Sequence, residues 1–186
     1  MRRTPLLLTA LLALAATAAA SADLSPARNL RGTWVSPLKG KAYQLTGRLD
    51  VPGSGWADIV ETGDIRLALT RVDGNKAYGT ITLSNKVETY TLTIKTVKGL
   101  KRYPAQRITS TEATSRQIVL TASSSRVSFS KVPVKNATVA LTTGRFTTSL
   151  LWGTMTETFQ GAASVGGTSG TMTRPLSGPF KLMKSG

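Results

Sequence analysis

The side chains that most often carry catalytic chemistry are scarce in this sequence. Histidine and cysteine are both absent. Imidazole is the usual base that activates a serine or cysteine nucleophile, so Ser-His-Asp and Cys-His sites are excluded. Zinc, copper or haem iron held by histidine or cysteine is excluded for the same reason. We therefore expect no catalytic residues, no metal ligands and no cofactor, and a protein that is not an enzyme.

Carboxylates are the first reactive groups that remain. Asp58, Glu61 and Asp64 lie close together in the chain, beside Trp56, whose ring can stack on a sugar. Glycoside hydrolases work with two carboxyl groups about 5 to 10 Å apart in a cleft. Thr62-Gly63 resembles a turn, however, and acidic residues at strand ends are usually just solvated. A carboxylate-based glycan enzyme is therefore only a third alternative.

Other short motifs that resemble catalytic or calcium sites are better explained by strands and turns. Ser36 and Lys39, like Ser128 and Lys131, have the Ser-x-x-Lys spacing of penicillin-recognising enzymes. That motif needs a helix, whereas residues three apart in an extended chain point to opposite faces. Asp73-Gly74-Asn75 is the nearest candidate for a calcium loop, but a turn explains it better. No glycine-rich phosphate-binding loop occurs.

Positive charge is the chain's most distinctive chemical property. Its formal net charge is +15, and a diffuse positive field favours association with polyanions. The densest basic stretch contains Gly99 and Pro104, which indicate a loop, and no acidic residue. It supplies our candidate polyanion-binding residues, which are Lys95, Lys98, Lys101, Arg102 and Arg107. The alternative is a solvated loop whose lysines protect a sheet edge.

The three tryptophans are the remaining candidates for binding. Trp34, Trp56 and Trp152 are expected in the core, which is the default for large aromatic side chains in strands. Grouped at one end of a barrel, they would instead form a platform for a ligand. We therefore retain them as candidate ligand-binding residues.

The pattern that must position these residues has a period of two. Ile65, Leu67 and Leu69 alternate with polar residues, and so do Leu92 and Ile94. Such alternation is typical of strands with one buried face, and threonine suits the solvated face. No long stretch shows helical spacing. The sequence therefore predicts an all-β fold, an antiparallel β-sandwich or β-barrel of about 10–13 short strands.

Turn residues divide the predicted strands. Asp73-Gly74-Asn75 predicts a hairpin turn and Ser84-Asn85-Lys86 a second turn, which gives a three-strand meander over residues 64–97. Pro52-Gly53-Ser54-Gly55 is a clear breaker, and residues 161–170 suit a flexible loop or a weakly packed strand pair equally well. Further strands are predicted at 31–36, 42–51, 104–110, 115–122, 126–134, 137–142, 145–152, 154–159, 169–174 and 178–183.

The first residues have the layout of a secretory signal peptide. Two arginines precede an apolar run that ends in the cleavage-site pattern Ala20-Ser21-Ala22. The run is about fifteen residues long, whereas a bilayer core needs about twenty. We expect residues 1–22 to be removed and residues 23–186 to form a single β-domain without a transmembrane segment. The protein is then exported, to the periplasm, the cell surface or the extracellular space.

Gly32-Thr33-Trp34 resembles the first-strand Gly-x-Trp signature of calycins, the superfamily of lipocalins and avidins. The resemblance covers about six residues, from Asn29 to Trp34. It implies a barrel with one end closed by Trp34 and a small apolar or heterocyclic ligand inside. The predicted number of strands exceeds the eight of such barrels.

We therefore expect a non-catalytic binding or structural protein of the cell envelope or extracellular space. Its basic surface would associate with an anionic envelope polymer or an acidic protein surface. Specific nucleic-acid recognition is not expected, because no recognition motif is present. The alternative is a calycin-like carrier of a small ligand in a barrel interior.

Overall fold

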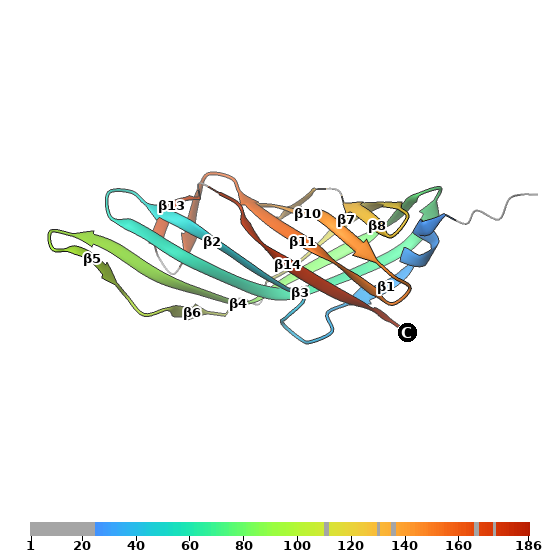
Figure 1. The fold of residues 1–186 in the computed structure, drawn as a ribbon, viewed down its shortest axis with the longest axis horizontal. Coiled ribbons are helices and arrows are strands. Elements are labelled where there is room, and N and C mark those ends of the chain that lie inside the picture. The colour runs from blue at the N-terminus through green and yellow to red at the C-terminus, as the bar shows by residue number, and fades with distance from the viewer. Residues whose placement is uncertain (1–24, 110–111, 130, 135–136, 166–167, 173) are drawn as a thin grey trace, which may run out of the picture.

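Nearly every described element of the computed structural model is a β-strand (Figure 1). The structure describes residues 25–109, 112–129, 131–134, 137–165, 168–172 and 174–186, and the predicted signal peptide lies outside these ranges. One short 3-10 helix, η1 (Pro26–Leu30), precedes the first strand. The strands are β1 (Gly32–Val35), β2 (Tyr43–Val51), β3 (Gly55–Asp73), β4 (Lys76–Thr96), β5 (Gly99–Arg102), β6 (Gln106–Ile108), β7 (Ala113–Ser123), β8 (Arg126–Phe129), β9 (Val132–Val134), β10 (Ala137–Phe146), β11 (Leu150–Phe159), β12 (Ala162–Val165), β13 (Thr168–Met172) and β14 (Leu176–Ser185).

The strands form one antiparallel sheet that closes on itself. Its central path runs β3-β1-β14-β11-β10-β8-β7-β4, and the pairing of β4 with β3 completes the ring. The eight strands of this ring follow one another in space as they do in the chain. The connections from β3 to β4, from β7 to β8 and from β10 to β11 are direct, whereas the others pass through β2, through β5 and β6, through β9, or through β12 and β13. The all-β antiparallel prediction is confirmed, and the pairing makes the fold a barrel.

The sheet extends beyond the ring at one end because two strands are very long. β3 has 19 residues and β4 has 21. The extra length of β3 pairs with β2, and β2 pairs in turn with β13. The extra length of β4 pairs with β5 and β6. Figure 1 shows the β4–β5 hairpin at one tip of the elongated molecule and η1 towards the other. The basic stretch that the sequence predicts as a loop therefore forms the β4–β5 hairpin, which projects from an end of the fold.

Alternation along β3 explains the core. Inward residues from Ala57 to Leu69 are buried, whereas their neighbours are half-buried or exposed. Apolar residues on the inner faces of the other strands complete one hydrophobic cluster. Burial of this apolar surface is the main stabilising contribution, since the chain has no disulfide.

Three features differ from the sequence-based expectation. The part of the chain that the structure describes has fourteen strands, one more than the predicted range, and β3 and β4 are not short. Residues 84–86 do not turn: β4 continues through them, and a bulge opposite Thr62 and Gly63 absorbs the irregularity. The predicted strand at 145–152 is divided by a turn at 147–149, where Thr147 and Leu150 are hydrogen-bonded. The turn predicted at residues 84–86 was wrong because the pairing of β4 with β3 outweighs the local preference of Ser84-Asn85-Lys86 for a turn.

The end of the barrel next to η1 is closed by Trp34. Its side chain is fully buried, and its Nε1 donates a hydrogen bond of 2.7 Å to the carbonyl oxygen of Leu30. The Nζ of Lys184 lies 5.3 Å from the indole centroid and donates to the carbonyl oxygen of Asn29. Trp34 is therefore part of the hydrophobic core, and its role here is structural.

Candidate functional site

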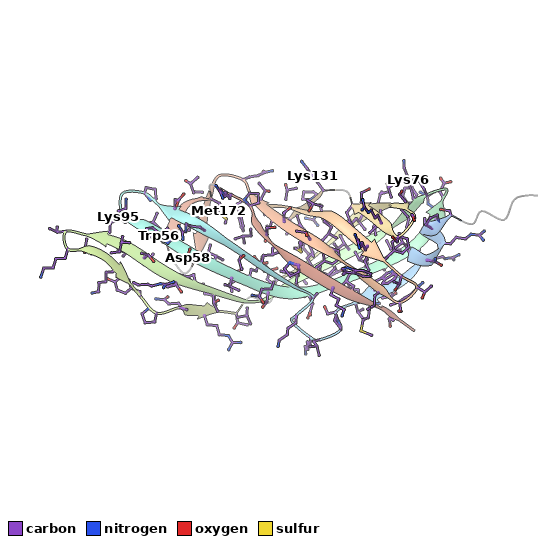
Figure 2. The ribbon with its side chains drawn as sticks, viewed as in Figure 1. Trp56, Asp58, Lys76, Lys95, Lys131 and Met172 are labelled. Carbon is purple, nitrogen blue, oxygen red and sulfur yellow. The ribbon has the colours of Figure 1, made fainter. Side chains whose placement is uncertain are left out.

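Four of the five predicted polyanion-binding residues lie on the β4–β5 hairpin at the extended end of the sheet. Lys95 is labelled near this tip in Figure 2, far from Lys76. In the pairing of β4 with β5, Arg102 lies opposite Thr93 and Lys101 lies opposite Ile94. Arg102 and Lys101 are neighbours in a strand, so their side chains point to opposite faces. The hairpin thus carries positive charge on both of its faces.

The tip of this hairpin is fully open to solvent. Lys95, Lys98, Lys101 and Arg102 are all exposed, and so is Val97. The Nζ of Lys101 lies 5.2 Å from the ring centroid of Tyr103, within the range of a cation–π contact. The structure places the fifth candidate, Arg107, elsewhere: on β6, opposite Thr89 of β4.

Arg107 belongs to a basic groove that the sequence did not reveal. The groove has a volume of about 550 Å³ and is bordered by β2, β14 and the loop before β2. Its cationic residues are Lys39, Lys41, Arg107 and Lys181. No carboxylate is among its lining residues. We call it the lysine groove.

A second groove lies on the outer face of β7, β8, β10 and β11. Its volume is about 600 Å³. Its lining residues include Arg126, Arg145 and Trp152, with no acidic residue, and we call it the tryptophan groove. A bulge in β10 places an additional residue, Thr142, at its border.

Strand register joins the two grooves. Arg126 lies opposite Arg145, Arg145 opposite Trp152, and Trp152 opposite Lys181. All four residues are exposed, so they form an outward row across β8, β10, β11 and β14. Neighbouring strands lie about 4.8 Å apart, so the row spans roughly 14 Å. Lys181 also borders the lysine groove, which makes the basic surface continuous.

The three tryptophans do not share one platform. Trp34 is part of the core, whereas Trp152 is 36% exposed in the tryptophan groove. Trp56 is half-buried near the extended end, where it is labelled in Figure 2. The guanidinium carbon of Arg48 lies 4.7 Å from the ring centroid of Trp56. The Nε1 of Trp56 lies 3.3 Å from the carboxylate of Asp58. Of the three, Trp152 is the one that combines exposure with a groove.

The acidic residues are distributed very differently from the basic ones. Asp58 is paired with Arg48 at 2.9 Å, and Asp73 with Arg71 at 3.8 Å. Asp64 accepts a hydrogen bond from the backbone N–H of Gly40. Asp58, Glu61 and Asp64 therefore have separate partners, and they do not form the clustered acidic site that their spacing suggested.

Two of the four glutamates, Glu61 and Glu157, are instead buried inside the barrel. Glu61 is 3% exposed and Glu157 is 6% exposed, and Glu88 lies opposite Glu61 in the pairing of β3 with β4. Glu61, Glu112 and Glu157 line a small interior cavity of about 30 Å³. That is room for about one water molecule. The four glutamates are all that the sequence contains.

Tyr43 completes this interior glutamate cluster. Its hydroxyl lies 2.9 Å from Oε1 of Glu61 and 2.7 Å from Oδ1 of Asn85. Gly63 gives the phenol its space, because a Cβ atom there would collide with the Tyr43 ring. Burial and the neighbouring Glu61 carboxyl raise the pKa of Tyr43, which keeps the hydroxyl protonated.

Burial also dominates the protonation of the glutamates. It raises the pKa of Glu61 to about 9, with further contributions from the charge of Glu157 and the hydrogen bond between the two carboxyl groups. Burial likewise raises the pKa of Glu157 and that of Glu88. A hydrogen bond between two carboxyl groups needs a proton, so the raised pKa values of Glu61 and Glu157 favour a proton shared by the pair.

The chemistry available to this carboxyl pair is limited by space. A glycosidase needs its two carboxyl groups several ångströms apart on either side of a sugar. Here the two groups are hydrogen-bonded to each other beside a cavity of about 30 Å³. The arrangement suits a protonated structural pair better than a catalytic one. Within the described ranges, no group of acidic side chains is arranged to hold a metal ion.

Comparisons with known proteins do not extend this description. No family model, no curated protein and no solved structure matches the chain. The part of the chain that the structure describes contains no helix with the length and apolar character of a membrane span.

Proposed function

We propose that this chain is an exported, non-catalytic binding protein of the cell envelope or extracellular space. It associates with anionic polymers through the basic outer face of its barrel. The face comprises the tryptophan groove, the lysine groove and the β4–β5 hairpin. An acidic protein surface is a second possible partner of the same chemistry.

The observation that carries the proposal is that cations, and no carboxylate, are among the residues that line both grooves. Lys39, Lys41, Arg107 and Lys181 border one groove in which no carboxylate takes part. Three of the four glutamates, Glu61, Glu112 and Glu157, line the small cavity instead of a groove. Among the described residues, the ion pairs engage Arg48 and Arg71, and neither of these belongs to a groove. A surface of one sign attracts polymers of the opposite sign.

The interior favours this function over that of a small-ligand carrier. Ligand pockets usually have volumes of about 300–1,000 Å³. The cavity beside Glu61 and Glu157 has about 30 Å³, and apolar side chains fill the space around it. The tryptophan groove and the lysine groove, which have larger volumes, lie on the outer surface of the barrel.

Chromatography on immobilised heparin tests the proposal. The purified protein should be retained at low ionic strength and should elute as salt screens the contacts. A column of uncharged dextran on the same matrix is the control and should not retain it. Passage through the heparin column at low salt would contradict the proposed function.

A further inference from the structure

The tryptophan groove has the features of a specific site within the basic surface. We propose that it binds an acidic saccharide, whose ring stacks on Trp152 while its carboxylate or sulfate groups bind Arg126 and Arg145. This inference rests on the proposed function and narrows it to one ligand class and one groove.

The first argument is the juxtaposition of two arginines. Arg126 and Arg145 are direct cross-strand partners, which places their Cβ atoms about 5 Å apart. Like charges in this position destabilise a sheet. No ion pair within the described ranges relieves them, and no acidic residue lines the groove. An anion between the two guanidinium groups would convert repulsion into charge-assisted hydrogen bonds, for which the planar fork of arginine is well suited.

The second argument is the exposed indole beside them. Trp152 is the direct partner of Arg145 and is 36% exposed, on a face where most outward residues are polar. Leaving a large aromatic ring in water forgoes the stabilisation that burial would give. A flat apolar surface next to cations can receive the C–H face of a sugar ring while its acidic substituent reaches the arginines.

The third argument is the hydroxyl groups around the groove. Thr121, Ser123, Ser128 and Thr142 contribute to its lining. Serine and threonine hydroxyls both donate and accept, which matches the hydroxyl groups of a saccharide. The volume of about 600 Å³ falls within the usual range for small-ligand sites, about 300–1,000 Å³.

The same features favour a saccharide over single-stranded nucleic acid. Proteins that bind single strands stack successive bases on several aromatic side chains along a positive groove. Trp152 is the only aromatic residue among those that line this groove. Its other neighbours are hydroxyl groups and arginines, which serve a polyhydroxylated anion better.

The row also suggests the direction of a longer ligand. Trp152 lies opposite Lys181, and Lys181 borders the lysine groove. A chain of acidic sugars that starts on Trp152 would cross β14 and continue towards Lys41. It would run across the strands, along the row of cations.

Fluorescence titration tests the proposal. The probes are an oligogalacturonate, a malto-oligosaccharide of equal length and an oligothymidylate. Trp152→Thr removes the ring at an outward position, and Arg126→Gln with Arg145→Gln removes the paired charges. Arg28→Gln with Arg66→Gln is the matched control, since it removes two exposed charges that line neither groove and lie outside the β4–β5 hairpin. Thermal unfolding of each variant verifies that the fold is intact.

We expect the oligogalacturonate to change tryptophan emission in the wild type, and the neutral oligomer to have no effect. Trp152→Thr, and separately Arg126→Gln with Arg145→Gln, should weaken binding measured by calorimetry at least about tenfold, and the control pair less than about threefold. Unchanged affinity in Trp152→Thr, or equal binding of the neutral oligomer, would overturn the site. Tighter binding of oligothymidylate would overturn the saccharide assignment. If the wild type and Trp152→Thr are retained equally on heparin, the proposed function still stands even where the saccharide site fails. If the wild type itself is not retained on heparin, the proposed function and the saccharide site are both refuted.

Discussion

The carboxyl group of Glu61 is hydrogen-bonded to that of Glu157 inside the barrel, although β3 and β11 are not neighbours in the sheet. The two strands face each other across the interior, so the pair connects opposite walls. Both residues are almost completely buried. A buried pair of this kind needs one proton, which makes the barrel sensitive to pH.

Stability should therefore decrease as the pH rises. Burial raises the pKa of Glu61 from its ordinary 4.5 to about 9, so the folded protein binds more protons than the unfolded chain between these values. The stabilisation from the raised pKa is complete below about pH 4.5 and is lost as the pH approaches 9. Urea denaturation at pH 5, 7 and 9 should show a decrease in the free energy of unfolding on the order of 3 kcal/mol across this range.

The variant Glu61→Gln isolates this effect from the general effect of net charge. Glutamine occupies the same space and can donate to Glu157, but it does not titrate. Its free energy of unfolding should depend on pH much less than that of the wild type. An equal dependence in both proteins would show that Glu61 does not carry the raised pKa.

Tyr43→Phe should make the barrel more sensitive to alkali. The hydroxyl of Tyr43 lies 2.9 Å from Glu61 and lowers the pKa of that carboxyl group. Without this donor the pKa of Glu61 should rise further, which carbon NMR of the side-chain carboxyl groups can measure. Tyr78→Phe is the control, because Tyr78 contacts Arg71 instead. A fall in the pKa of Glu61 in Tyr43→Phe would contradict the geometry.

Trp34→Phe should destabilise the fold, whereas Trp152→Phe should not. The first change leaves the buried carbonyl of Leu30 without its donor and creates a small cavity. The expected cost is about 1–3 kcal/mol for the unpaired group, with the cavity in addition. Surface substitutions usually stay within about 0.5 kcal/mol, which is the expectation for Trp152→Phe. Chemical denaturation of both variants measures the contrast, and similar losses would argue against their separate roles.

Local patterns predicted the class of fold because one face of each strand is buried. Ile65, Leu67 and Leu69 alternate in the sequence, and β3 buries all three. Asp73-Gly74-Asn75 was correctly assigned to the hairpin between β3 and β4. The pairing of β12 with β13 agrees with one of the two interpretations of residues 161–170, a strand pair. Closure of the ring could not be predicted, because it depends on pairing between the two ends of the chain, as in β1 with β14.

The site was predicted only in part, for the same reason. The basic stretch from Lys95 to Arg107 is continuous in the sequence and was easy to find. Arg126, Arg145 and Lys181 are isolated in the sequence, and only strand register brings them into one row with Trp152. The glutamate cluster was missed because no motif links residues on β3, β4 and β11. The signal available in the sequence was the rarity of glutamate in a strongly basic chain.

The central claim is that the outer face of this barrel binds anionic polymers by charge. Its most direct test is the affinity for heparin measured by calorimetry at a series of salt concentrations. We predict that the logarithm of the association constant decreases steadily as the logarithm of the salt concentration rises, since each cationic contact releases counterions. Absence of binding at low salt, or an affinity that does not change with salt, would contradict it.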